Sequence, residues 1–513
     1  MNSEPNSPKE SAGLLNLPLM NLQQRWLLIA FVILKLALIW FVPLTGDEAY
    51  FITWGQSLEL GYYDHPPAVG WVLFALSSLY DNLVFYRLFA FLSAIVIAYL
   101  LFRTLLLHPK MNRQIAYWVA LAFFVSPISL MFVVTANDTV LVFFAVVGFY
   151  FFAKALAHPN WVTAILAGVF LGLAFLSKYF AGFMLLGLLA YSVVYWKQLN
   201  LKQIALMVGI VLLFVAENFY FNATHCWNNI LFNFFSRTQE SQLEIENVMV
   251  YLLMIVMLIS PLGAFYLLRD KSILRIEKDR FIKRLALFAS LPLLAVLLLV
   301  SFTNQVGLHW PLISVTILYV LYGCLSQEKV EKIFRFNAYS SLLIGGLLLV
   351  ALMFVDDLIK PKHQHKVPIY TQPQKVCDLI PTDGEFFTLG YSSQSGLSYY
   401  CKNDNIHVFM STSKFGREDD KKTNFKTMDG QTLNILIVSK KSLDKAKAYF
   451  KTTQVQELKI SEDVTYYWLE GQGFDYQKYR EQVLKPVNEA YYTAPDWFPV
   501  LSNGCGFKEK YDF

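Results

Sequence analysis

Charged residues are scarce in this sequence of 513 residues: they make up 16% of it, whereas hydrophobic residues make up 56% and aromatic residues 16%. Soluble domains carry a larger charged share and a smaller apolar share. The composition therefore excludes an ordinary soluble protein and predicts a polytopic membrane protein. The formal net charge of +5 is small for this length, and the sequence carries no nucleic-acid-binding signature.

The sequence also lacks the glycine motifs that bind nucleotide phosphates, because it contains neither a Walker A pattern nor a Rossmann glycine run. Internal repeats and heptad arrays are absent as well. Cysteine is rare, and its five residues form an odd number that fixes no pairing. A disulfide between Cys377 and Cys401 and a set of unpaired thiols are both open alternatives.

Long apolar runs, by contrast, recur over most of the sequence. A hydrocarbon core about 30 Å thick is crossed by about 17 to 22 helical residues. By this criterion about eleven transmembrane helices are expected. The runs cover residues 26–43, 83–102, 115–134, 140–157, 161–176, 179–196, 204–220, 248–268, 285–302, 310–325 and 338–355. The first run is long enough to be retained as a helix rather than removed with a signal peptide.

Lysine and arginine gather after the even-numbered runs. They are Arg103, Lys110 and Arg113, then Lys197 and Lys202, then seven residues between Arg269 and Arg284, then Lys329, Lys332 and Arg335. Basic loops stay in the cytoplasm. We therefore expect a cytoplasmic segment 1–24 and a membrane domain 25–356. The first loop 44–82, the loops near 135–139, 177–179, 221–247 and 303–309, and everything after residue 356 are expected on the far side.

Residues 357–513 have a different character. The stretches NILIVS (434–439) and VTYYWLEG (464–471) predict strands, and SLDKAKAYFK (442–451) predicts a helix. Clusters of proline, glycine and aspartate separate them. We expect a small α/β domain outside the cytoplasm, where cysteines can be oxidised.

The loops expected on the far side hold the polar residues that are candidates for a functional site. The first loop contains Asp47, Glu48, Tyr62, Tyr63, Asp64 and His65, and the later loops contain Asp138, Lys178, His225, Trp227, Arg237 and His309. Each has a structural alternative, such as a helix N-cap for Asp138 or snorkelling for Lys178. Acids, cations and aromatic rings on one surface nevertheless suit a substrate with a sugar phosphate and a lipid tail.

Several motifs carry a family resemblance. DEAYFITW and GYYDHPP in the first loop are followed by FYRLFAFLSA (85–94), ANDTVLVFF (136–144), GLAFLSKYFAGFML (172–185), a pattern from Asn222 to Arg237, and HWP (309–311). Together they resemble the bacterial branch of the dolichyl-phosphate-mannose protein mannosyltransferase superfamily. Within it the chain is similar to the ArnT-like enzymes, which add aminosugars to lipid A and have the membrane glycosyltransferase fold GT-C. The resemblance covers roughly residues 25–325.

The resemblance implies transfer of a sugar from an undecaprenyl-phosphate carrier to a periplasmic acceptor, most simply lipid A, at the bacterial inner membrane. It makes Asp47 the general base or orienting group. Glu48 and Asp138 complete the expected catalytic set, and Lys178, Arg237, His65 and His309 would bind the donor phosphate. Tyr62, Tyr63 and Trp227 would contact substrate.

One departure from the family pattern concerns the paired prolines. ArnT-like enzymes have Glu-Lys before them, and this sequence has Asp64 and His65. The departure weakens a phosphate-binding role for His65. It leaves Asp64 with His225 as a two-residue candidate site for a divalent cation, zinc or magnesium.

Two other functions stay open from the sequence. The acceptor of the same transferase reaction can be a protein or another glycan instead of lipid A. A secondary transporter is the second alternative, and Lys35, inside the first apolar run, is the residue that favours it.

Overall fold

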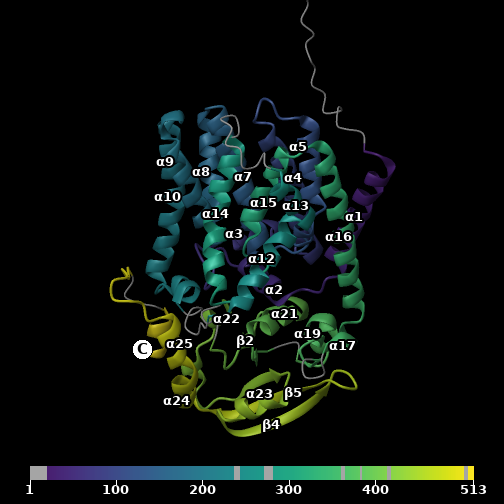
Figure 1. Cartoon of the computed structure of the whole chain (residues 1–513). Coiled ribbons are helices and arrows are strands. Elements are labelled where there is room, and N and C mark those ends of the chain that lie inside the picture. The colour runs from purple at the N-terminus through teal and green to yellow at the C-terminus, as the bar shows by residue number, and fades with distance from the viewer. Residues whose placement is uncertain are drawn as a thin grey trace, which may run out of the picture.

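The computed structural model describes residues 20–235, 243–270, 281–359, 364–381, 384–412, 418–501 and 506–513. These residues form a bundle of long helices with a small domain built on a sheet at one end (Figure 1). The expected combination of a mainly helical membrane part with a C-terminal α/β domain is confirmed.

Every apolar run of the sequence coincides with a helix or with two consecutive helices. They are α1 (Leu22–Phe41), α4 (Leu83–Leu105), α5 (Arg113–Phe124) with α6 (Pro127–Leu130), α7 (Asn137–Ala157), α8 (Trp161–Phe175), α9 (Ala181–Val194), α10 (Leu201–Thr224), α12 (Ile245–Ile259) with α13 (Pro261–Arg269), α14 (Phe281–Ser301), α15 (Leu312–Leu318) with η5 (Tyr319–Cys324), and α16 (Gln327–Met353). Within the described ranges, six of these are long and apolar enough to cross a membrane unaided, and α12 with α13 forms a seventh span bent by 90°. The other expected spans are shorter helices or are broken by a turn.

Asparagine residues set the start of several bundle helices. Asn21, Asn82, Asn112, Asn160 and Asn200 are the N-caps of α1, α4, α5, α8 and α10, and each side chain accepts a hydrogen bond from a backbone N–H of the first turn. Such a cap satisfies donors that a helix start would otherwise leave without a partner. The asparagines therefore fix where the apolar runs become helical.

Small residues bring α8 and α10 together. A Cβ atom built on Gly172 of α8 would lie 2.2 Å from the ring of Phe214 on α10, so this position has room only for glycine. Membrane helices lack a hydrophobic drive to associate, and close backbone approach at small residues replaces it.

The first loop folds into two short helices, α2 (Gly46–Trp54) and α3 (Ala68–Ser77). Thr45 caps α2, since its hydroxyl accepts a hydrogen bond from the backbone N–H of Glu48. Figure 1 shows α2 between the helix bundle and α21 of the C-terminal domain. The loop therefore joins the two parts of the molecule.

The C-terminal domain contains a mixed sheet of five strands in the order β2-β1-β3-β5-β4. The strands are β1 (Phe386–Thr388), β2 (Ile406–Val408), β3 (Leu433–Ile437), β4 (Phe450–Lys459) and β5 (Thr465–Phe474). β1 pairs in parallel with β2 and β3, whereas β5 runs antiparallel to both β3 and β4. The strands expected near 434–439 and 464–471 are confirmed as β3 and β5.

The helix expected at 442–451 ends earlier than the sequence suggested. It is α23 (Lys440–Lys447), and Phe450 already begins β4. The aromatic pair Tyr449 and Phe450 is typical of strands and is buried or half-buried against the sheet, which favours the strand over a longer helix.

Short helices complete the chain. They are η1 (Trp196–Gln198), α11 (Asn228–Ile230), η2 (Leu231–Phe235), α17 (Val355–Leu358), α19 (Pro368–Thr371), α20 (Pro373–Cys377), α21 (Tyr391–Cys401), α22 (Glu418–Lys422), η6 (Phe425–Met428), α24 (Tyr476–Tyr479), η7 (Arg480–Leu484), α25 (Lys485–Tyr491) and α26 (Gly506–Tyr511).

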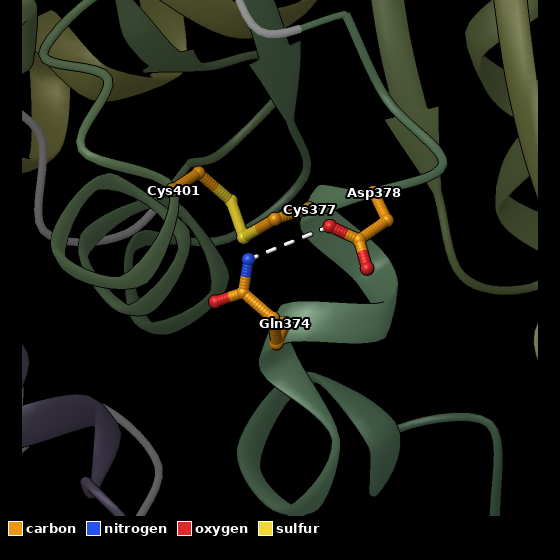
Figure 2. Close-up of a disulfide and its surroundings, with 4 residues drawn as sticks. All are labelled: Gln374, Cys377, Asp378 and Cys401. Carbon is orange, nitrogen blue, oxygen red and sulfur yellow. Dashed lines mark hydrogen bonds between the residues drawn. A yellow bond between two sulfur atoms is a disulfide. The ribbon is translucent and has the colours of Figure 1, made fainter.

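A disulfide joins α20 to α21. Cys377, the last residue of α20, is bonded to Cys401, the last residue of α21 (Figure 2). Beside the bridge, the side-chain amide of Gln374 donates a hydrogen bond to Asp378 at 3.4 Å, one helical turn further on. Of the two alternatives for these cysteines, the disulfide is the one that forms.

Candidate functional site

A cavity of about 680 Å³ opens where the bundle meets α2. Its walls come from five segments: the start of α2, His65 before α3, residues 131–139 before and within α7, the turn between α8 and α9, and the loop that leads into α15. Six of the residues singled out from the sequence line it: Asp47, Glu48, His65, Asp138, Lys178 and His309. Residues that lie far apart in the chain thus form one site.

Asp138 and Lys178 form an ion pair in the wall of this cavity. The Lys178 Nζ atom donates to Oδ1 and Oδ2 of Asp138 at 2.8 and 3.0 Å, and the two side chains are only 11% and 13% exposed. Asp138 lies in the first turn of α7, but the N-cap is Ala136, so an N-cap does not explain the aspartate. The Nζ atom also lies 5.1 Å from the ring centre of Phe180. Snorkelling does not explain this lysine, because its charge is held inside the site.

His309 lies on the other side of Asp138. Its Nε2 atom is 3.8 Å from Asp138 Oδ2. Burial lowers the pKa of the His309 imidazole below its usual value, while the nearby Asp138 carboxylate acts in the opposite direction. His309 therefore adds a neutral, hydrogen-bonding ring to the cavity near neutral pH.

Glu48 is bound on both carboxylate oxygens by Arg87 of α4. The Arg87 Nε and Nη2 atoms donate to Oε1 and Oε2 at 2.8 and 2.6 Å, and both side chains are 1% exposed. Arg87 also donates to the backbone carbonyls of Ile39, Val42 and Pro43. The pair ties the end of α1 to the start of α2, so Glu48 is part of the framework of the cavity wall. Its place in the catalytic set stays a prediction.

Arg87 was missed by the sequence reasoning although it stands in the quoted stretch FYRLFAFLSA. A single arginine inside an apolar run could have indicated a buried ion pair, since a charged side chain there requires a partner.

Asp47 receives a hydrogen bond from the C-terminal domain. The Tyr391 hydroxyl, at the start of α21, donates to Asp47 Oδ1 at 2.7 Å. Asp47 itself belongs to the first turn of α2. A carboxylate there is favoured by the positive end of the helix dipole. No spacing in the sequence could have indicated Tyr391, which lies 344 residues from Asp47.

The three aromatic residues expected to bind substrate are packed inside the protein. The Tyr62 ring stacks on Trp54 with ring centres 4.4 Å apart, and its hydroxyl donates to the Trp54 carbonyl. Tyr63 is 3% exposed, and Trp227, 5% exposed, donates its indole N–H to the carbonyl of Pro499. None of the three lines the cavity. The structure therefore shows a packing role for the three residues, and their contact with substrate stays a prediction.

Asp64 and His225, the two residues expected to hold a metal ion, each contact another side chain, and a metal pair between them stays a prediction. Asp64 is fully buried, with its Oδ1 atom 3.3 Å from Nδ1 of His65. The His225 ring stacks on Phe221, with ring centres 4.2 Å apart. In the part of the chain that the structure describes, no three His, Cys, Asp or Glu side chains gather to hold a metal ion. A divalent cation held elsewhere stays a prediction.

The remaining phosphate-binding candidate, Arg237, lies outside the described residues. Near the end of α10, Asn218 accepts a hydrogen bond at 3.0 Å from the hydroxyl of Tyr179, which lies in the turn between α8 and α9.

Residues 64–221 match the family "Dolichyl-phosphate-mannose-protein mannosyltransferase". A curated relative, the lipid A galacturonosyltransferase RgtD of Rhizobium johnstonii, is 26% identical over 183 residues, which cover 35% of this chain. The match spans only 38% of that relative's length. These matches confirm the resemblance drawn from the motifs.

Solved structures establish the fold. The chain resembles ArnT from Cupriavidus metallidurans in its apo state, with a TM-score of 0.56 and 13% identity, and in complex with undecaprenyl phosphate, with a TM-score of 0.58 and 14% identity. Each comparison covers 87% of this chain and 98% of the other. The chain is therefore a multi-pass membrane protein with the ArnT-like GT-C fold.

Proposed function

We propose that this chain is a membrane glycosyltransferase that moves one sugar from an undecaprenyl-phosphate-linked donor to lipid A. One observation carries the proposal: Asp47, Asp138 and Lys178 share a single cavity at the rim of a bundle with the ArnT fold. The relative that acts on lipid A and the undecaprenyl phosphate bound to ArnT support the classes of acceptor and donor.

Asp47 is the catalytic carboxylate in this proposal. The acceptor oxygen attacks the anomeric carbon, a new bond forms there, and the bond from that carbon to the phosphate oxygen breaks. Where the acceptor is a hydroxyl, Asp47 takes its proton, a contribution of about 10² to 10⁴-fold. Where the acceptor is a lipid A phosphate, it is already ionised, and Asp47 orients the reactants instead.

Lys178 is the group best placed to stabilise the departing undecaprenyl phosphate. Negative charge grows on that phosphate as the bond breaks, and a cation fixed beforehand lowers the barrier. In the structure Lys178 is paired with Asp138, so an incoming phosphate has to share it. The two histidines of the cavity, His65 and His309, and Arg237 outside the described residues complete the proposed phosphate site.

The cavity and the C-terminal domain face the periplasm in this proposal, and the bundle spans the bacterial inner membrane. No nucleotide is required, since the phosphoester of the donor drives the transfer.

Mass spectrometry of lipid A tests the proposal directly. A strain lacking the protein should lose one sugar-sized mass from its lipid A, and the wild-type gene should restore it. Asp47→Asn should not restore it although the protein is made and inserted, because the carboxylate is gone while the packing volume is kept.

The opposite results are equally clear. An unchanged lipid A spectrum overturns lipid A as acceptor and points to a protein or another glycan. Full restoration by Asp47→Asn removes Asp47 from the chemistry.

The transporter alternative finds no support at Lys35. This lysine is fully buried, its Nζ atom lies 2.9 Å from the Ser129 hydroxyl, and four phenylalanine rings surround it at 5.5 to 6.0 Å. These surroundings are typical of a packed structural residue, because the faces of the aromatic rings attract a buried cation.

A further inference from the structure

The C-terminal domain packs directly on the helix that carries Asp47. Gly46, the residue before Asp47, has no room for a side chain, because a Cβ atom built there would lie 2.4 Å from the Cβ atom of Ser392 on α21. The start of α2 and the start of α21 are therefore in van der Waals contact. Figure 1 shows the same two helices next to each other.

Further contacts fix this arrangement. The rings of Tyr50 on α2 and Tyr391 on α21 meet edge to face, with centres 5.2 Å apart. At the other end of α21, the Tyr400 hydroxyl is hydrogen-bonded to the backbone of Leu44. Tyr50 is 1% exposed, so its ring is buried in this interface.

A separate ion pair holds the domain further along the first loop. The Nζ atom of Lys421 lies 2.6 Å from Glu59 Oε2. The C-terminal domain thus contacts the first loop at several points, and these contacts fix the position of the domain relative to Asp47.

We infer that Tyr391 is a positioning residue for Asp47, and that the C-terminal domain in this way completes the active site. The inference rests on the proposed function, in which Asp47 is the catalytic carboxylate. It adds a residue from a domain outside the region matched by the family comparison, which ends at residue 221.

The geometry gives Tyr391 a specific task. Its hydroxyl donates to Asp47 Oδ1 at 2.7 Å, a hydrogen bond to a charged group and therefore a strong one. The tyrosine ring packs on Tyr50, and the next residue, Ser392, packs on Gly46, so the start of α21 is fixed beside Asp47. An aspartate in the first turn of a helix rotates about two side-chain bonds. The fixed donor selects one orientation, and with it the direction in which the carboxylate meets the acceptor.

Tyr391→Phe tests this with the purified full-length protein, a lipid A acceptor and the undecaprenyl-linked donor. The ring and its packing stay, and only the hydroxyl is lost. We expect kcat to fall about 10- to 100-fold, because small misplacement of a reacting group has costs of this size. KM for the donor should stay within about twofold, since the hydroxyl does not act on the donor phosphate.

Tyr400→Phe is the matched control. It removes a hydroxyl from the same helix and the same domain interface, but one that contacts Leu44 and not Asp47. It should keep kcat within about twofold of the wild type. Thermal unfolding of both variants in detergent reports any loosening of the domain.

The outcomes separate the two proposals. If Asp47→Asn is inactive and Tyr391→Phe turns over like the wild type, the inference fails and the proposed function stands. If Tyr391→Phe and Tyr400→Phe lose activity and thermal stability equally, Tyr391 has only a docking role and the inference also fails. If Asp47→Asn stays active, Asp47 is not the catalytic carboxylate, and the inference fails together with that part of the proposed function.

Discussion

At the scale of single residues, Glu48 and Arg87 form an ion pair in the site whose two side chains are each 1% exposed. Replacing Arg87 by Met leaves the Glu48 carboxylate buried without its cation, at a cost of about 3 to 5 kcal/mol. We expect a large drop in the thermal unfolding midpoint in detergent and little folded protein. The midpoint, followed by intrinsic fluorescence, is the measurement.

The double variant Glu48→Gln with Arg87→Met provides the check, because it removes both charges and should regain much of the lost stability. Lys332→Met at the exposed pair with Glu328, where the side chains are 45% and 75% exposed, is the matched control. It should leave the midpoint close to that of the wild type, because an exposed ion pair contributes little. An equal midpoint for Arg87→Met and the control would show that the buried pair does not hold the first loop.

The residues of the cavity show what a sequence can reveal about a site. Asp47, Asp138, Lys178 and His309 were identified because basic loops fixed which loops share a side of the membrane. The sequence could not show which residues pair, because the contact of Lys178 with Asp138 and that of Tyr391 with Asp47 depend on the fold.

At the scale of elements, the disulfide between α20 and α21 is expected to secure the helix that carries Tyr391. The bridge joins residues 24 apart, and chain entropy assigns a loop of this size about 3 kcal/mol. Cys401→Ser should lower the midpoint of the C-terminal domain and make α21 more sensitive to proteases. Transferase activity should fall with it, since α21 positions the Tyr391 hydroxyl.

Cys324→Ser is the control for this experiment, because Cys324 lies in η5 of the helix bundle and forms no disulfide. It should leave protease sensitivity and activity as they are. If the Cys401→Ser protein keeps wild-type protease resistance and activity, the bridge does not secure the position of α21.

The elements themselves were predictable to different degrees. Long apolar runs gave the bundle helices because the membrane thickness demands about 20 residues per span. β1 and β2 have three residues each and carry no periodicity that could be recognised. The aromatic pair at 449–450 ended α23 early, because packing against the sheet outweighed local helix preference.

At the scale of the whole molecule, the exposed basic residues and the candidate catalytic residues lie at opposite ends. The C-terminal ends of α4 and α9 lie at the end of the bundle far from the C-terminal domain, whereas α2 lies at the near end (Figure 1). The exposed residues Lys110 and Lys197 follow α4 and α9, and Asp47 belongs to α2. Insertion follows the basic loops, which remain in the cytoplasm. A chain with this asymmetry should present its cavity to the periplasm.

Labelling of single engineered cysteines tests this orientation, in a Cys324→Ser background that removes the thiol of Cys324. Gln305→Cys lies on the cavity rim at an exposed position, and Lys110→Cys lies in an exposed loop at the other end. A membrane-impermeant maleimide should label position 305 in cells whose outer membrane alone has been opened. Position 110 should react only after the inner membrane is opened, because its loop is cytoplasmic. If position 110 reacts while the inner membrane is intact, the basic loops lie in the periplasm. The cavity would then face the cytoplasm, which contradicts transfer to a periplasmic acceptor.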